Sequence, residues 1–229
     1  MINKIGVICA HPDDEVLGCG GTMARLAESG HDVHVLVLGE GATSRDLLRH
    51  EEGKRHELDM LRQAALAAAK VLGVQSVAFG GFPDNRMDGV ELLDIVKGVE
   101  RFLAEKQVTT VLTHHGGDLN IDHQIVHRAV LTACRPLPGS TIQTLLCFEV
   151  PSSTEWSAGS IAAPFHPNWY EDIEHTLARK LQALQCYEME MRPWPHPRSF
   201  RGIEALAHWR GASVGKQAAE AFELSRLVR

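Results

Sequence analysis

One imidazole and three carboxylates stand close together early in the chain, in the sequence His11-Pro12-Asp13-Asp14-Glu15. This stretch follows a short apolar run and precedes a glycine-rich one. Such an order is typical of a turn between a strand and a helix, where α/β proteins hold catalytic groups. Imidazole and carboxylate are also side chains with which proteins bind zinc. The sequence therefore predicts a metal site at this turn.

The spacing of these residues divides the chemistry among them. His11 and Asp14, three residues apart across a tight turn, can converge on one cation, while Asp13 faces whatever that cation activates. Two ligands and one free carboxylate make half of a hydrolytic zinc site. A third ligand is expected from the loop after a later strand, because parallel strands place their carboxyl-end loops side by side. His123 is the expected ligand there, and His127, on the same helical face, is the alternative.

A set of parallel strands is needed to bring these residues together. Short apolar runs rich in β-branched residues predict buried strands over residues 4–10, 31–38, 74–79, 108–113 and 141–150. Helices are expected from about 20 to 29, 46 to 72, 90 to 106, 124 to 134, 171 to 191 and 200 to 225. The stretches 151–170 and 192–199 are punctuated by proline and are expected to be irregular. The predicted fold class is a Rossmann-like, doubly wound, mostly parallel α/β sheet with an irregular C-terminal third.

Composition narrows the class of protein and its partners. With 229 residues, 44% of them hydrophobic, the chain is expected to form a single domain over residues 1–229. The formal net charge of −6 gives no reason to expect nucleic acid or an anionic membrane as a partner. No apolar run approaches the ~20 residues of a membrane span, and the first residues do not form a signal peptide. The five scattered cysteines predict a reducing, cytoplasmic compartment.

The segment from Ala10 to Thr22, with Asp122 and His123, resembles the PIG-L/LmbE family of metal-dependent N-deacetylases. Weaker similarity extends over nearly the whole chain. The resemblance implies an LmbE-like fold and hydrolysis of the acetamide of N-acetylglucosamine units in glycolipids, thiol-glycoside precursors, antibiotics or sugar nucleotides. It further implies zinc as the cofactor. The implied ligands are His11, Asp14 and His123, and Asp13 is the implied general base.

One position departs from the common pattern of the family. Asn120 stands where many relatives have a histidine, and a neutral amide cannot act as a general acid, although its N–H could bind a developing oxyanion. His196, on the proline-rich loop, is the candidate for the missing imidazole, with His115 behind it. The alternative for His196 is that it only caps its turn. Asp13 could also return the proton itself.

Other polar residues are candidates for binding the substrate. Asp84 resembles the family's loop aspartate that grips sugar hydroxyls, and Arg86 lies in the same cluster. Arg198 could contact a ring hydroxyl or a phosphate-bearing leaving portion. The alternative for Asp84 is an Asx turn after Pro83, and the alternative for Arg198 is a surface salt bridge.

The predicted function is that of a zinc-dependent N-deacetylase acting on a small N-acetylated amino sugar or its conjugate. One alternative is an amidase that cleaves another sugar or thiol-glycoside conjugate. Another is a carbohydrate-binding protein without catalysis, which would have no need of Asp13. The proline- and tryptophan-rich C-terminal third could pack against a second protomer, so a homo-oligomer is possible.

Overall fold

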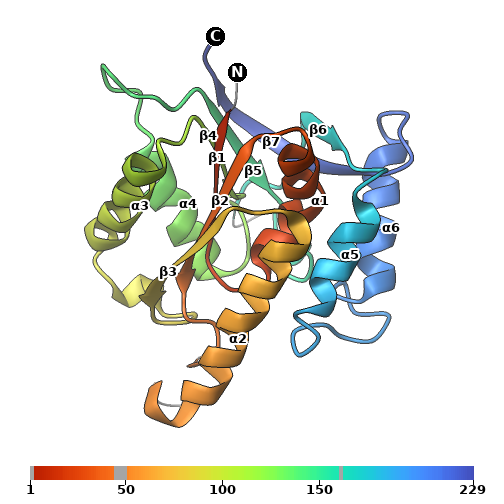
Figure 1. Ribbon diagram of the computed structural model, residues 1–229, viewed down its shortest axis with the longest axis horizontal. Helices are drawn as coiled ribbons and strands as arrows, with labels where there is room; N and C mark the ends of the chain where they lie inside the picture. Colours follow the sequence, from red (N-terminus) through yellow and green to blue (C-terminus); the bar gives the residue numbers. More distant parts are fainter. Residues whose placement is uncertain (1–2, 44–50, 160–161) are drawn as a thin grey trace.

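The computed structural model describes residues 3–43, 51–159 and 162–229 (Figure 1). Residues 44–50, which include the start expected for the second helix, lie outside the described part. In chain order, the elements are β1 (Lys4–Cys9), α1 (Asp14–Glu28), β2 (Asp32–Gly39), α2 (Glu51–Leu72), β3 (Ser76–Phe82), η2 (Met87–Gly89), α3 (Leu92–Lys106), β4 (Thr110–His114), α4 (Ile121–Ala133), β5 (Thr144–Phe148), η3 (Thr154–Trp156), β6 (Trp169–Asp172), α5 (Leu177–Gln185), α6 (Phe200–Ala212) and β7 (Ala219–Leu227). No helix among the described residues is both long enough and apolar enough to cross a bilayer.

The strands form one seven-stranded sheet in the order β3-β2-β1-β4-β5-β7-β6. The first five strands of this order are parallel, and β7 runs antiparallel to both β5 and β6. The predicted doubly wound, mostly parallel α/β class is confirmed. From β1 the chain proceeds outward to β3, and it then returns to place β4 on the other side of β1. Such a reversal leaves a crevice beyond the carboxyl ends of the two strands, where ligands of open α/β sheets bind.

Apolar side chains cover both faces of the sheet. Val7 and Val35 belong to the core cluster on one face, and Ile8 and Leu36 belong to the cluster on the other. Because successive side chains of a strand point to opposite faces, burial of both faces requires continuous apolar runs. In Figure 1, α3 and α4 lie on one side of the sheet, and α1, α2, α5 and α6 lie on the other.

Helix α1 corrects the expectation that this helix begins near Gly20. It begins at Asp14 and contains a kink at Cys19, whose φ of −146° is not helical. The buried carboxylate of Glu220 accepts hydrogen bonds from the backbone N–H groups of Gly21 and Thr22 just after the kink, at 3.0 and 2.7 Å. The glycine-rich sequence therefore marks the second half of a helix whose first half carries the candidate site.

The C-terminal third is more regular than the sequence predicts. The helix expected over 171–191 is preceded by β6, and α5 itself ends at Gln185. The helix expected over 200–225 ends at Ala212, and the remaining residues enter the sheet as β7. The sequence of β7, Ala-Glu-Ala-Phe-Glu-Leu-Ser-Arg-Leu, contains several good helix formers, so pairing with β5 and β6 overrides local propensity here.

Candidate metal centre

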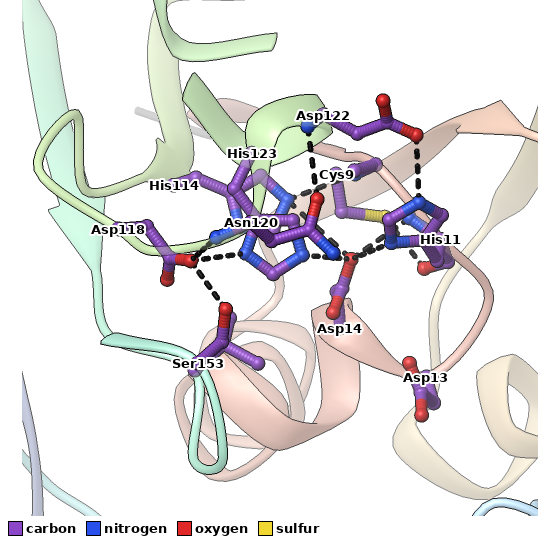
Figure 2. Close-up of polar contacts among 12 residues, drawn as sticks. Cys9, His11, Asp13, Asp14, His114, Asp118, Asn120, Asp122, His123 and Ser153 are labelled. Atoms are coloured by element: carbon purple, nitrogen blue, oxygen red, sulfur yellow. Dashed lines mark hydrogen bonds and ion pairs between the residues drawn. The ribbon is translucent and has the colours of Figure 1, made fainter. Parts of the chain in front are cut away.

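The three expected ligands come from the ends of two neighbouring strands. His11 follows β1, Asp14 opens α1, and His123 lies in the first turn of α4, which follows β4. One ligand atom from each lies within 4.8 Å of the others. Asp14 Oδ2 is 3.4 Å from His11 Nδ1 and 3.3 Å from His123 Nε2 (Figure 2). The structure therefore brings together three residues that are up to 112 positions apart in the sequence.

The donor atoms of this cluster fit a divalent metal. Asp14 and His123 are completely buried, yet Asp14 Oδ1 and His123 Nε2 make no hydrogen bond within the described residues. Buried polar atoms are nearly always paired, and those that are not require an explanation. Two imidazoles and one carboxylate around a common point are a ligand set found in catalytic zinc sites. A metal among them would satisfy both atoms.

The charges of the cluster also favour a cation. Although burial disfavours a charged imidazole, the carboxylates of Asp14 and Asp118 raise the pKa of His123 to about 9. Burial also lowers the pKa of His11, but the hydrogen bonds to Asp122 and Asp14 outweigh this effect. The pKa of His11 therefore lies well above its usual range. The pKa of Asp14 is held well below its usual range by the imidazoles, despite its burial. Positive charge at the centre of the cluster is therefore stabilised.

The second nitrogen of His11 is held by carboxylates on the far side of the ring. Nε2 donates to Asp122 Oδ2 at 2.9 Å and lies 3.3 Å from Asp84 Oδ1. These three side chains are close enough to form a second metal cluster by distance. Both oxygens of Asp122, however, accept backbone N–H groups, from Asn85 at 2.6 Å and Met87 at 3.0 Å. Asp122 therefore orients the imidazole and leaves Nδ1 directed at Asp14, as is usual for metal-binding histidines.

His123 is held from behind by Asp118. Asp118 Oδ1 lies 3.2 Å from His123 Nδ1, and the carboxylate accepts from Thr154 Oγ1 at 2.6 Å and from Ser153 Oγ. Burial would raise the pKa of Asp118, but the close imidazole of His123 and the hydrogen bonds from Ser153 and Thr154 lower it to about 2. A permanently ionised carboxylate at this position fixes the ring of His123.

His114 completes the support of the cluster. Its ring stacks on that of His123 with centroids 3.9 Å apart, and its Nε2 accepts a hydrogen bond from Ala10 N at 2.8 Å. Burial and the neighbouring His123 lower its pKa well below the usual range, so it remains neutral. His114 and Asp118 are functional candidates that sequence reasoning missed, and Asp122 was named within the family motif but was given no role. The loop after β4 is a polar run, but no spacing within it distinguishes a ligand from its support.

Asp13 stands beside the three ligands (Figure 2). Its side chain is 4% exposed, and Arg198 Nη1 donates to its Oδ2 at 2.9 Å. Burial raises the pKa of Asp13 to about 8, although the charge of Arg198 acts in the opposite direction. A carboxylate with a pKa near neutrality can both accept and return a proton.

An open cavity of about 240 Å³ gives access to this region. Its lining comprises His11, Pro12, Asp13, Gly41, Asp84, Asn85, Asn120, Glu190, Arg192 and Arg198. Of the expected substrate-binding residues, Asp84 and Arg198 line this cavity. Arg86 does not, since it lies just before the short helix η2.

The structure shows the hydrogen-bond partners of Asn120 and His196, two residues that the sequence predicts to be catalytic. Asn120 caps α4, accepting from Asp122 N at 2.9 Å, and its Nδ2 donates to Asn85 Oδ1 at 2.8 Å. His196 Nδ1 accepts from Arg198 N at 3.1 Å, and its ring meets the edge of Trp156 outside the cavity lining.

Two further histidines point to other partners. His115 is bonded to Glu223 at 2.6 Å and to the carbonyl of Ala163 at 2.9 Å. His127, the alternative ligand, donates from Nδ1 to the carbonyl of His114 at 2.8 Å, and it is absent from the metal clusters of the described residues.

A doubly wound α/β sheet with a His/Asp/His cluster that could hold a metal at its reversal, and a buried carboxylate beside that cluster, is the arrangement of a class of metal-dependent enzyme sites. The chain belongs to the PIG-L family, described as GlcNAc-PI de-N-acetylase, whose pattern matches residues 6–134.

The chain is also similar to individual proteins, among them a deacetylase and a hydratase. The uncharacterized deacetylase YaiS of Escherichia coli is 31% identical over 189 residues, which cover 79% of this chain and 88% of that protein. The 4-oxalmesaconate hydratase of Pseudomonas putida is 30% identical over 219 residues, which cover 87% and 80%. The structure of N,N'-diacetylchitobiose deacetylase from Pyrococcus horikoshii has a TM-score of 0.77 at 18% identity, covering 98% of this chain and 84% of the other, and thus shares its fold.

Proposed function

We propose that this protein is a zinc-dependent N-deacetylase that hydrolyses the acetamide of an N-acetylated amino sugar or its conjugate. The observation that carries the proposal is the His11/Asp14/His123 cluster with Asp13 beside it, opening on one polar cavity. Membership of a family described as de-N-acetylases supports the reaction, as does the similarity to a deacetylase of Escherichia coli.

His11, Asp14 and His123 would hold the metal and leave a coordination position open. Two imidazoles and one carboxylate favour zinc over the hard cations Mg²⁺ and Ca²⁺, which prefer oxygen ligands. When bound, such an ion lowers the pKa of a water molecule towards ~7 and polarises the carbonyl of the substrate. Asp118 and Asp122 keep the two imidazoles in the orientation that this requires.

Asp13 would manage the protons of the reaction. Its carboxylate accepts a proton from the water as the new C–O bond forms, and Arg198 holds that carboxylate in place. The C–N bond then breaks, and the departing amine takes a proton to leave as product beside acetate. Among the described residues lining the cavity, the only imidazole is that of His11, a metal ligand. We therefore assign the return of the proton to Asp13 as well.

The proposal changes the roles of two residues named from the sequence. Arg198 becomes the partner of Asp13, and Asn120 becomes the cap of α4 and a neighbour of Asn85. Asp84 keeps its proposed contact with sugar hydroxyls, because it lines the cavity next to His11. Arg86 stays a prediction without a place in the cavity.

The decisive experiment is a screen for acetate release by zinc-reconstituted protein. Substrates would include free N-acetyl sugars, sugar nucleotides and thiol glycosides, with larger acyl groups included to separate deacetylase from general amidase activity. We expect about one zinc per chain, loss of metal in His11→Ala, and loss of turnover with retention of metal in Asp13→Asn. Full activity of Asp13→Asn, or no acetate from any substrate, would contradict the proposal.

A second candidate is addition of water to an unsaturated carboxylate. Two observations favour this reaction. The chain is similar to the hydratase of Pseudomonas putida, and Arg192 and Arg198 in the cavity wall carry the positive charge that a carboxylate substrate requires. The same protein sample would be offered unsaturated di- and tricarboxylates, and loss of the conjugated absorbance would be followed. Turnover there without acetate release from amino sugars would replace the first proposal by this one.

A further inference from the structure

Asp13 has a backbone conformation that side-chain-bearing residues rarely adopt. Its φ is +115° and its ψ is −30°, immediately before the first helical residue of α1. A positive φ places Cβ close to neighbouring backbone atoms, and such strain persists only where surrounding contacts enforce it. In this conformation the carboxylate of Asp13 accepts a hydrogen bond from Arg198. Some contact must therefore hold the peptide of Asp13.

Glu15 supplies that contact. Its Oε2 accepts the backbone N–H of Asp13 at 3.1 Å, and the side chain is buried. The sequence suggests only a negative charge at a helix start, a role that concerns the free N–H groups of the first turn. Here Val16 N and Leu17 N instead bond to the carbonyl of Asp13. The carboxylate of Glu15 is thus directed back to the residue before the helix.

Tyr187 fixes Glu15 in turn. Its hydroxyl donates to Glu15 Oε1 at 2.6 Å, and its ring is fully buried in the main core. Tyr187 follows α5, so the contact joins the C-terminal third to the turn after β1. The carbonyl of Tyr187 also accepts Glu190 N at 2.8 Å, and Glu190 lines the cavity. One buried residue, Tyr187, therefore connects the strained turn with Glu190 in the cavity lining.

We propose that Glu15 and Tyr187 are positioning residues that hold the peptide of Asp13 in its positive-φ conformation while Arg198 holds its carboxylate. The proposed catalysis then depends on a two-point hold, in which the backbone end and the side-chain end of one residue are fixed from different elements. The inference rests on the proposed function for its kinetic part. Its structural part concerns only the backbone of Asp13.

The test compares four variants of the zinc-loaded protein. Tyr187→Phe removes one hydroxyl without leaving a cavity, Glu15→Ala removes the acceptor, and Glu15→Gln keeps an oxygen for Asp13 N. Thr176→Val is the matched control. The buried hydroxyl of Thr176 also donates to α1, to the carbonyl of Gly21 at 2.8 Å, but this bond lies further along the helix than Asp13.

We expect Tyr187→Phe and Glu15→Ala to lower kcat for acetate release by about 10- to 100-fold, with KM within about twofold and one zinc retained per chain. Glu15→Gln should recover part of the loss, and Thr176→Val should keep the wild-type kcat. In crystal structures of Glu15→Ala, Asp13 should leave the positive-φ region while His11 and Asp14 keep the metal.

The proposal is overturned if Tyr187→Phe and Glu15→Ala keep the wild-type kcat, or if their kcat falls only in proportion to lost zinc. If Glu15→Ala does not fold, the same criteria apply to Tyr187→Phe. If the wild-type protein releases no acetate, the proposed function fails, and the crystal structures alone decide the inference. A φ of Asp13 that is unchanged in both variants then rejects it, and a φ that has become negative supports it.

Discussion

Arg198 Nη1 lies 2.9 Å from Asp13 Oδ2, across 185 positions of sequence. The guanidinium is held on its other side, where Nε donates to Ser152 Oγ at 2.7 Å. A charge-assisted hydrogen bond of this kind is stronger and shorter than a neutral one. Arg198 is thus a partner of the proposed base before it is a contact for any substrate.

Replacing Arg198 should therefore affect the chemical step. Arg198→Met leaves the buried carboxylate of Asp13 without its partner, and we expect kcat to fall by about 10- to 100-fold with zinc content unchanged. Arg198→Lys should retain part of the rate, and Arg201→Met, on the exposed face against Trp194, should be neutral. A rise in KM with unchanged kcat would identify Arg198 as a substrate contact instead.

Asn120 should matter more for stability than for catalysis. Its side chain caps α4 through the bond from Asp122 N, and loss of such a cap costs about 1 kcal/mol of the free energy of unfolding. We expect Asn120→Ala to show this loss in urea denaturation, with a smaller loss of turnover than Asp13→Asn. Asn120→Ser, which can still cap the helix, should restore the stability. A turnover as low as that of Asp13→Asn would make Asn120 an essential oxyanion donor.

Much of the sheet, and the clustering of His11, Asp14 and His123, could be predicted from the sequence. Runs such as residues 4–10 and 108–113 are continuous and β-branched because both faces of the central strands are buried. The order of parallel strands then places the loop after β1 beside the loop after β4, which is sufficient to pair His11 with His123. The C-terminal end of the chain was harder to predict, because β7 has the composition of a helix and becomes a strand only by pairing with β5 and β6.

The supports of the site were not predictable in the same way. Tyr187 and Glu220 act through contacts that depend on the final packing of distant elements, and Asp118 is held by a bond from the distant Thr154. Local spacing carries no trace of such contacts. Arg198 was named from its sequence, yet its partner could be found only from the position of its loop over the turn at Asp13.

The buried ion pair of Lys180 and Glu220 should be essential for stability. Lys180 Nζ lies 2.6 Å from Glu220 Oε1 and donates to the carbonyl of Leu17 at 2.8 Å, joining α5, β7 and the kink of α1. Lys180→Met leaves an unpaired buried carboxylate, which typically costs about 3–5 kcal/mol. Urea unfolding should show this loss, whereas Lys97→Met, from the exposed pair with Glu100, should change the free energy of unfolding by less than about 0.5 kcal/mol. Equal effects of the two substitutions would contradict the assignment.

The pair of His115 and Glu223 should make stability depend on pH. Burial opposes the charge on His115, but hydrogen bonds to Glu223 and to the carbonyl of Ala163 raise its pKa above 6.5. Burial would raise the pKa of Glu223, but the hydrogen bond from His115 lowers it below 4.5. The contribution of the histidine is complete below its unfolded pKa and is lost as the pH rises through its folded pKa. That of the glutamate is complete above its unfolded pKa and is lost as the pH falls through its folded pKa.

The difference in Tm between wild type and Glu223→Gln should therefore be largest at about pH 5.5, between the two unfolded pKa values, and smaller at more acid and more alkaline pH. The exposed His208 provides the control, since His208→Gln should show no such maximum. A Tm difference that is constant with pH would show that the pair is not ionised in the folded protein.

The site is completed in the order in which the chain is made. The three proposed ligands are all present once residue 123 has been synthesised. Tyr187, which contacts Glu15, and Arg198, which contacts Asp13, are made much later. The proposed ligands therefore precede the residues that hold Asp13 in the order of synthesis. Hydrolytic activity is expected to begin only when the last third has folded back onto the first turn, so that a growing polypeptide carries no active base.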